Sequence, residues 1–245
     1  MKIVMIIPFR ADSDGFRKRN LLSVLAYYNQ KFETIVVEQS SRPVFPPDNR
    51  IFWSSSCVSL CDDGPFNRAI CLNQGARMYP DFDWLIFSDG DVIHPNLFAR
   101  IPTDTNTPIF ISPKNRIMDM TEEQTQKFIA TEYFPYQDKI QRFRNYVTDG
   151  SALCILNKKA FELSGGWDER FEGWGGEDEA FSVVCRKHPG ISFIQTNDTL
   201  YHLEHPYIKE TKDFNPELHA KNVALRDLAQ KDTARYMKER GLPWM

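Results

Sequence analysis

The sequence lacks long apolar runs, paired cysteine motifs and any excess of basic residues. No hydrophobic stretch approaches the roughly 18 residues that a membrane-spanning helix requires. The first apolar stretch begins at Ile3 and has only Lys2 as a basic residue before it, which predicts a strand and not a signal peptide. The formal net charge of -3 disfavours general binding to a phosphate backbone, although it leaves room for a local basic groove.

Cysteine is scarce, with five residues and no C-x-x-C pair. An odd number without such pairs indicates reduced thiols in a cytoplasm and not a disulfide framework. Cys57 and Cys61 could begin a zinc site, but no second pair of ligands matches them. Internal repeats and flexible linkers are also missing, so the sequence predicts one domain over residues 1–245.

Strand and helix patterns alternate through the first half of the chain. Residues 2–9 are a continuous apolar run, residues 15–30 have helical spacing, and residues 34–38 are β-branched. This order predicts an α/β fold with a mostly parallel central sheet flanked by helices. Further strands are predicted at 51–53, 83–87, 109–112 and 152–156. Further helices are predicted at 66–78, after Thr121 with Gln124 in the capping-box position, and at 157–165 with Asn157 as the cap. Residues 215–241 are predicted to form a broken amphipathic helix with a packing role only.

Two carboxylates, Asp89 and Asp91, follow directly after the predicted strand 83–87. Ligands of open α/β sheets bind beyond the carboxyl ends of the strands. Carboxylates at this spacing can hold a hard divalent cation whose free positions accept diphosphate oxygens. A plain surface turn at Asp89 and Gly90 explains the motif equally well.

A second group of metal-ligating residue types occurs in YHLEHP, where His202 and His205 flank Glu204. Imidazole together with carboxylate suits manganese, zinc or iron more than calcium. A single histidine is more often a structural residue. The pair, in a chain that also has the two aspartates, favours a metal site.

The segment FEGWGGEDEA at 171–180 combines three glycines with a cluster of acids. Glycine gives the backbone freedom on both sides of Trp174, whose flat ring could cover a sugar. Glu177, Asp178 and Glu179 follow at once. Acids also suit the first turn of a helix, so a purely structural origin is the alternative interpretation.

Taken together, these motifs resemble those of the beta-1,4-galactosyltransferase family and its bacterial relatives, which have the GT-A fold. The matching segments are IIPFR at 6–10, FNRA at 66–69, FSDGD at 87–91, GSA at 150–152 and GWGGED at 173–178, followed by a histidine. They occur in the family's order across residues 3–207. The combination is specific, whereas each segment alone would be weak.

The resemblance implies a metal-dependent, inverting glycosyltransferase. Such an enzyme moves a hexose or N-acetylhexosamine from a UDP-sugar to an acceptor hydroxyl, and Mn²⁺ or Mg²⁺ would be its cofactor. By the same resemblance, residues 1–100 form the nucleotide-binding part, 101–214 the acceptor and catalytic part, and 215–245 the C-terminal helix. Residues 116–146 are expected to select the acceptor, which we expect to be a glycan.

Individual roles follow from the resemblance in the same way. Asp178 corresponds to the general base, and Trp174 and Glu177 join it in binding the acceptor. Asp91 and His205 correspond to metal ligands, and His202 stands where the family has a methionine ligand. The donor-binding positions are Arg10, Phe66, Arg68, Asp89, Tyr146 and Trp174.

The chain departs from the family in ways that affect these expectations. Asp12 replaces a basic residue of the family's PFRNR motif, so one diphosphate contact is not matched. The anchor and stem of the animal enzymes are not matched either, which predicts a cytoplasmic enzyme of bacterial or phage origin without an obligatory protein partner. A nucleotidyltransferase, or a phosphoesterase using Asp89, Asp91, His202 and His205, is the alternative function. A nucleic-acid acceptor is disfavoured by the charge.

Overall fold

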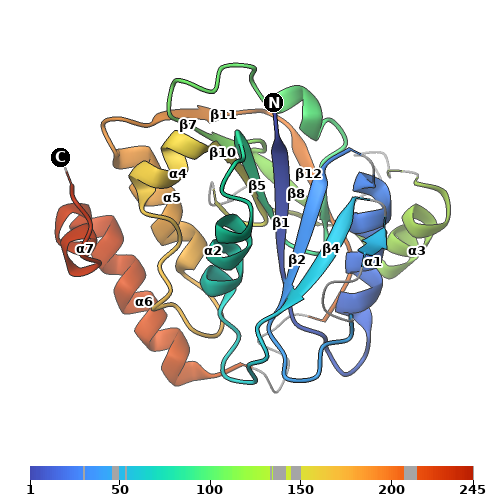
Figure 1. Ribbon diagram of the computed structural model, residues 1–245. Helices are drawn as coiled ribbons and strands as arrows, with labels where there is room; N and C mark the ends of the chain where they lie inside the picture. Colours follow the sequence, from blue (N-terminus) through green and yellow to red (C-terminus); the bar gives the residue numbers. More distant parts are fainter. Residues whose placement is uncertain are drawn as a thin grey trace.

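An eight-stranded sheet forms the centre of the protein in the computed structural model (Figure 1). The structure describes residues 1–29, 31–45, 50–52, 54–132, 134, 142–144, 150–206 and 214–244, with the backbone alone for 50–52 and 142–144. The strand order is β11-β7-β10-β5-β1-β2-β4-β3. The strands are β1 (Ile3–Phe9), β2 (Glu33–Glu38), β3 (Arg50–Phe52), β4 (Ser55–Ser59), β5 (Trp84–Ser88), β7 (Ile109–Ser112), β10 (Leu153–Asn157) and β11 (Ser192–Gln195).

Parallel pairing dominates this sheet, as predicted. β1 runs parallel to β2 and β5, β2 to β4, and β7 to β11, whereas β10 is antiparallel to both β5 and β7, and the edge strand β3 is antiparallel to β4. Successive side chains of β1 point to opposite faces. Met5 and Ile7 belong to the core on one face, and Val4 and Ile6 belong to the core on the other. Both faces are therefore buried, which explains the continuous apolar sequence of the strand.

Helices cover the two faces of the sheet (Figure 1). On one face lie α1 (Phe16–Tyr28) and α3 (Glu122–Thr131), and on the other lie α2 (Arg68–Met78), α4 (Lys158–Ser164) and α5 (Glu177–Lys187). Gly75 lets α2 approach β1 closely, because a Cβ atom there would stand 2.5 Å from Ile6 Cγ2. Thr121 and Gln124 form the predicted capping box of α3.

A second sheet of four short strands lies beside the first, and the sequence patterns did not predict it. Its order is β6-β12-β8-β9, and its strands are β6 (Val92–Ile93), β12 (Thr199–His202), β8 (Arg116–Asp119) and β9 (Arg142–Arg144). β12 runs parallel to β8, so that His202 stands opposite Asp119, and antiparallel to β6. This pairing brings residues near 92, 118 and 202 to one place.

The C-terminal segment forms α6 (Pro216–Lys231) and α7 (Thr233–Glu239), and the break that the sequence predicts within it falls at Asp232. Asn215 caps α6, since its side-chain oxygen accepts hydrogen bonds from two backbone N–H groups of the first turn. A separate apolar core joins this segment to α5 and includes Ala180, Ala229 and Met237. Among the described residues, no helix has the length and apolar character needed to cross a bilayer.

Candidate functional site

A cavity of about 1090 Å³ lies at the edge of the central sheet where β1 and β5 end. Its wall consists of the loops after these strands, the segment 173–179 and the beginning of α6. Tyr146 lies outside the described residues. Every other candidate lines the cavity: Arg10, Phe66, Arg68, Asp89, Asp91, Trp174, Glu177, Asp178, His202 and His205.

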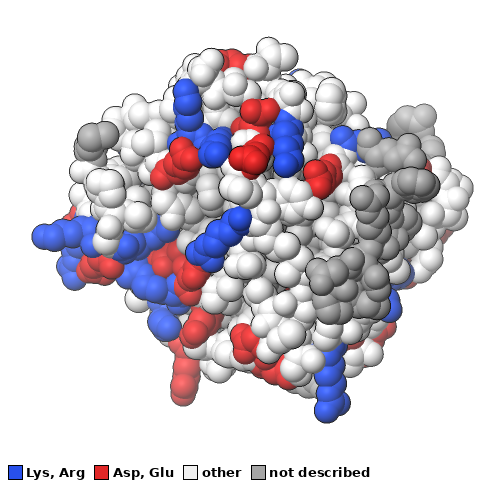
Figure 2. Space-filling model, in the orientation of Figure 1, with Lys and Arg blue, Asp and Glu red and all other residues white. Residues whose placement is uncertain are grey.

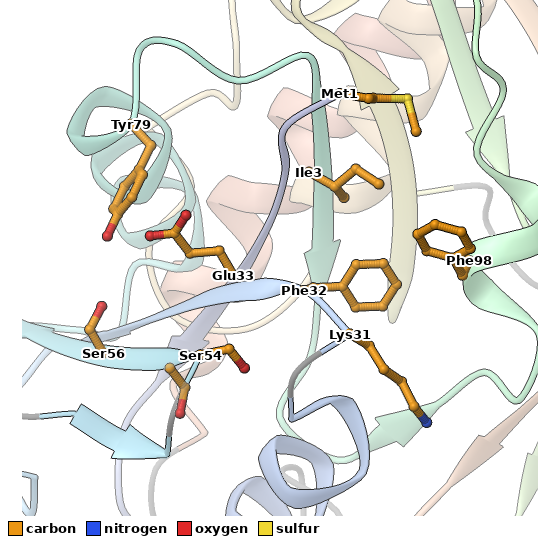
Figure 3. Close-up of a pocket in the computed structure, with 10 residues that line it drawn as sticks. Met1, Ile3, Lys31, Phe32, Glu33, Ser54, Ser56, Tyr79 and Phe98 are labelled. Atoms are coloured by element: carbon orange, nitrogen blue, oxygen red, sulfur yellow. The ribbon is translucent and has the colours of Figure 1, made fainter.

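A smaller cavity of about 500 Å³ lies at the opposite ends of the same strands (Figure 3). It is lined by Ile3 at the start of β1, Glu33 at the start of β2, Tyr79 after α2 and Phe98 from the short 3-10 helix Leu97–Arg100. None of the candidate residues in the described part of the chain contributes to it. We therefore assign the functional site to the larger cavity.

Backbone hydrogen bonds fix the two aspartates at the end of β5. The N–H of Asp89 donates to the carbonyl of Ala152 at 2.7 Å, which extends the pairing of β5 with β10. The N–H of Leu203 donates to the carbonyl of Asp91 at 2.8 Å. The pairing of β12 in the second sheet thus places residues 202–205, which contain both histidines, beside the D-x-D motif at 89–91.

Asp91, His202 and His205 form a compact set of possible metal ligands. His205 Nε2 lies 3.0 Å from Asp91 Oδ2 and 3.2 Å from His202 Nε2, and His202 Nε2 lies 3.8 Å from Asp91 Oδ1. One carboxylate and two imidazoles suit a transition metal such as manganese, and three protein ligands leave positions for other oxygens. The donor atoms therefore fit the expected ion. Glu204, which lies between the histidines in sequence, is not part of this set.

The carboxylate of Asp91 and the two imidazoles influence one another's protonation through their charges. Burial alone would raise the pKa of Asp91, but the charges of His202 and His205 and the hydrogen bond from His205 hold it well below its ordinary value. Burial lowers the pKa of His205, and the hydrogen bond and charge of Asp91 more than compensate and raise it to about 9. A bound cation would take over the role that the protonated imidazole has beside Asp91.

The histidine segment is held from two sides. His202 Nδ1 lies 3.2 Å from Asp119 Oδ1 on the neighbouring strand β8. The backbone carbonyl of Glu204 accepts hydrogen bonds from the side chains of Arg19 and Asn20 on α1, both at 3.0 Å. These contacts fix the ring of His202 and the chain between the two histidines.

Arg68 connects the D-x-D motif with the acids of α5. Its guanidinium lies against Asp89, with Nη2 at 2.8 Å from Oδ1, and its Nη1 is 3.9 Å from Glu177 Oε1. The same group stacks over the ring of Trp167 at 4.8 Å. The side chain of Arg68 is largely buried, and its positive charge lies between the carboxylate of Asp89 and that of Glu177.

Arg10, which the family resemblance assigns to donor binding, is engaged by the protein's own backbone. Three of its N–H groups donate to backbone carbonyls, those of Gln39 at 2.8 Å, Gly64 at 2.7 Å and Asp62 at 3.3 Å. Its guanidinium also lies 5.6 Å from the centre of the Phe66 ring. Arg10 therefore holds the loop that precedes α2 in place at the cavity wall.

The glycine-rich segment has the backbone that its sequence predicts. Gly173, Gly175 and Gly176 have φ values of +72°, +95° and +97°, in the left-handed region that favours glycine. The N–H of Gly173 donates to the carbonyl of Phe66 at 2.8 Å. Trp174 at the centre of the segment lines the cavity.

The C-terminal helix α6 holds this segment in place. His219 Nδ1 lies 3.2 Å from the carbonyl oxygen of Trp174, and the two rings are 5.1 Å apart. The buried side chain of Asn222 donates to the carbonyl of Glu172 at 2.8 Å. Phe214 and several residues of α6 also line the cavity. Residues 215–241 thus have the predicted packing contacts, and tertiary structure also brings the first turn of α6 and Arg226 to the cavity wall.

Glu177 and Asp178 begin α5 at the bottom of the cavity. Burial, and then the neighbouring charge of Asp178, raise the pKa of Glu177 to about 7 despite the opposing effect of Arg68. The carboxylate of Asp178 accepts a hydrogen bond from the N–H of Glu179 at 2.8 Å. Two adjacent acids thus have different surroundings, which is typical of sites that use carboxylates for separate tasks.

Glu179, to which the sequence assigned no role, connects α5 with α6. Its Oε2 lies 3.4 Å from Arg226 Nε and accepts a hydrogen bond from Gln230 at 3.1 Å. The third acid of the motif is therefore an anchor for the C-terminal helix.

Sequence reasoning missed several residues of the cavity wall. Arg17 from α1 and His219 from α6 line the cavity, and Asp119 lies behind it against His202. None of them belongs to a motif with recognisable spacing. Their only signal is polar character at positions that the folded chain brings beside the motifs.

Comparison with known proteins supports the expected class of fold. Residues 4–215 match the family described as Glycosyltransferase like family 2. A variant of Drosophila beta1,4-galactosyltransferase 7, solved in complex with manganese, UDP-Gal and xylobiose, is similar in structure with a TM-score of 0.50 and 18% identity. That alignment covers 90% of this chain and 79% of the Drosophila chain.

A second similar structure is GalNAc-T7 in complex with UDP, GalNAc and Mn²⁺. Its TM-score is 0.57 at 12% identity, and the alignment covers 100% of this chain and 55% of the other. At these identities the likeness concerns the fold alone. It confirms the predicted GT-A architecture, a mostly parallel sheet flanked by helices.

Proposed function

Because the chain belongs to glycosyltransferase-like family 2, we propose that it transfers a hexose or N-acetylhexosamine from a UDP-sugar to a hydroxyl of a carbohydrate acceptor, with inversion at the anomeric carbon. One observation carries this proposal. A single cavity combines the ligand set of Asp91, His202 and His205 with the acids Glu177 and Asp178. A cation held by such ligands can bind a diphosphate, and a carboxylate can act as the base that accepts the proton of a hydroxyl.

In this proposal Asp91, His202 and His205 hold Mn²⁺, or Mg²⁺ in its place, as their donor set allows. When bound, the cation neutralises negative charge on the departing UDP. Both similar structures carry manganese and either UDP or a UDP-sugar, which supports the same cofactor and donor class here.

The protein's own residues supply the rest of the reaction. Asp178 accepts the proton of the acceptor hydroxyl while the oxygen forms a bond to the anomeric carbon. The bond from that carbon to UDP breaks at the same time, and its electron pair leaves with the diphosphate. A positioned base of this kind contributes about 10²- to 10⁴-fold to the rate.

Other residues position the substrates. Asp89 is held by Arg68, and Phe66 lines the same cavity. In this proposal Asp89 accepts a hydrogen bond from a ribose hydroxyl of the nucleotide, and Phe66 borders the base. Trp174 covers the sugars and keeps water out of the cavity, and Glu177 binds the acceptor. Accordingly, residues 1–100 provide the nucleotide-binding part and 101–214 most of the acceptor and catalytic part. The C-terminal helix completes the acceptor wall.

A carbohydrate acceptor agrees with the distribution of surface charge. On the face shown in Figure 2, acidic and basic side chains are interspersed, and the described residues form no continuous basic surface there. Nucleic acids are bound mainly through such basic surfaces. We therefore favour a glycan over a nucleic acid as the acceptor.

The test combines a binding panel with product analysis. Nucleotide sugars are screened by thermal shift with Mn²⁺ or Mg²⁺, because a ligand that binds the folded state raises its melting temperature. The stabilising donor is then incubated with glycan acceptors. We expect a UDP-sugar to stabilise the protein and UDP to be released with formation of a glycoside. Release of pyrophosphate would indicate a nucleotidyltransferase, and hydrolysis without an acceptor would indicate a phosphoesterase; either result contradicts the proposal.

A further inference from the structure

Among the described residues, four arginines line the cavity, and three of them are already bound within the protein. Arg10 donates to three backbone carbonyls, and Arg68 and Arg226 lie against carboxylates. Arg17 is different: in the part of the chain that the structure describes, no hydrogen bond or ion pair engages its guanidinium. A partly exposed cation without an acceptor, in a cavity whose other arginines are engaged, is available to a ligand.

The position of Arg17 is fixed through its backbone. It is the second residue of α1, and both carboxylate oxygens of Asp12 lie 3.2 Å from its backbone N. Asp12 therefore has a defined task in this chain. It satisfies an N–H group of the first helical turn, a group that has no partner within the helix.

Arg17 also lies on the metal-ligand side of the cavity. Its neighbour Arg19 on the same helix holds the carbonyl of Glu204, between the two histidines. Arg17 itself lines the same cavity as Asp91, His202 and His205. The positive charge of its guanidinium acts on the carboxylate of Asp91.

Charge balance shows what this cation could do. A divalent ion on one carboxylate and two neutral imidazoles has a net charge of one positive unit. The diphosphate of a UDP-sugar carries two negative charges, and the departing UDP gains a further one. A further cation near the ion would offset this negative excess, and guanidinium binds phosphate oxygens with strong, charge-assisted hydrogen bonds.

We propose that Arg17 binds the diphosphate of the donor and supplies the cation that the sequence lacks at position 12. This inference rests on the proposed function, since it requires a nucleoside diphosphate in the cavity. Arg17 would contact the substrate directly and would stabilise the leaving group as its charge grows. Arg17 would thereby add its positive charge to that of the metal ion. Asp12 would position the first turn of α1, from which Arg17 extends.

The test compares UDP with uridine, because only UDP contains the diphosphate. Their affinities are measured by calorimetry in the presence of Mn²⁺ for the wild type, Arg17→Ala and Arg17→Lys. Lys18→Ala is the matched control, since Lys18 is an exposed cation on the same helix and does not line the cavity. We expect Arg17→Ala to weaken UDP binding about 10- to 100-fold and to leave uridine binding unchanged. Arg17→Lys should retain part of the affinity, and Lys18→Ala all of it.

The possible results separate this inference from the proposed function. If the wild type binds no UDP with Mn²⁺, the proposed function and this inference both fail. If the wild type binds UDP and Arg17→Ala binds it equally well, only the role of Arg17 fails. Equal weakening of UDP and uridine would mean that Arg17 shapes the cavity without contacting phosphate, and this would also overturn the inference. Binding of Mn²⁺ alone should not weaken in Arg17→Ala, which provides a check on the integrity of the ligand set.

Discussion

Asp119 Oδ1 lies 3.2 Å from His202 Nδ1, and the two residues stand opposite each other on the parallel strands β8 and β12. The other ring nitrogen of His202 faces His205 and Asp91. A carboxylate in this position fixes the tautomer and the orientation of a histidine ring. Asp119 therefore holds the ring of His202 in the orientation in which its Nε2 atom can bind a metal ion.

Replacing Asp119 should weaken metal binding. Asp119→Ala removes the acceptor for His202 Nδ1, and we expect a loss of about 10- to 100-fold in Mn²⁺ affinity by calorimetry. Asp119→Asn should lose less, because the amide oxygen can still accept the hydrogen bond. Glu123→Ala removes an exposed acid from α3 and should bind Mn²⁺ like the wild type. Unchanged affinity in Asp119→Ala would show that His202 needs no such support.

Asp91→Asn should abolish the gain in UDP affinity that Mn²⁺ provides. The carboxylate is the anionic member of the ligand set, and an amide is a far weaker ligand for a divalent cation. The measurement is the UDP affinity with and without Mn²⁺. Asp14→Asn, at an exposed acid of the loop before α1, serves as the control. If Mn²⁺ still strengthens UDP binding to Asp91→Asn, the metal assignment is wrong.

Asp178→Asn should lose most of the transfer activity while it retains binding. Loss of a positioned base lowers the rate by about 10²- to 10⁴-fold. Affinities for Mn²⁺ and UDP should remain near those of the wild type, because Asp178 is not part of the ligand set. Glu179→Gln is the matched control, since Glu179 is the acid next to Asp178 and contacts Arg226 of α6. Near-normal turnover by Asp178→Asn would remove Asp178 from the role of base.

The stability of the protein should depend on pH through Glu177. In the folded state its pKa is about 7, above the ordinary value of 4.5, because burial disfavours the charged form. Between these pKa values the folded state holds a proton that the unfolded state has lost, so the stability should fall as the pH rises from 4.5 to 7. A difference of one pKa unit corresponds to about 1.4 kcal/mol.

Glu177→Gln isolates this contribution. Its free energy of unfolding, measured with denaturant from pH 4.5 to 8, should lack the part of the decline that Glu177 causes. Glu162→Gln, at a residue outside the cavity, should keep the decline of the wild type. Identical pH profiles of Glu177→Gln and the wild type would refute the raised pKa.

Asn222→Ala should loosen the connection between α6 and the Trp174 segment. Its buried side chain donates to the carbonyl of Glu172 at 2.8 Å, and loss of a buried hydrogen bond costs about 1–3 kcal/mol. Faster proteolysis or hydrogen exchange in residues 172–176 would report the loosening. Lys221→Ala removes only an exposed contact with the side chain of Glu172 and should have little effect. If both variants exchange at the same rate, α6 does not hold the segment.

Local sequence signals predicted the elements that local physics controls. The apolar run of β1, the capping box at Thr121, the cap at Asn157 and a break within the C-terminal helical segment all occur as expected. The two aspartates at the end of β5 could also be placed, because the end of a buried strand in an α/β sheet is a ligand site. In these cases the responsible contacts join residues close in sequence.

The strands of the second sheet escaped prediction because they are short and mix polar with apolar residues. β6 has two residues, and β8 (RIMD) and β12 (TLYH) have four each, whereas the equally short β7 (IFIS) is nearly all apolar. The pairing of the second sheet therefore depends on contacts with distant parts of the chain. Only the register of β12 against β8 places Asp119 behind His202. The sequence could identify the histidine as a candidate ligand, but not the carboxylate that orients it.

The same division holds for the whole site. The sequence alone determined the α/β class, the position of the metal-ligating residue types and the glycine-rich turn before the acids, because composition and spacing specify them locally. Tertiary structure decided that Arg10 is engaged with backbone carbonyls, that the guanidinium of Arg17 has no hydrogen-bond or ion-pair partner among the residues the structure describes, and that α6 forms part of the cavity wall. These outcomes depend on which surfaces meet in the folded chain, and long-range packing sets them.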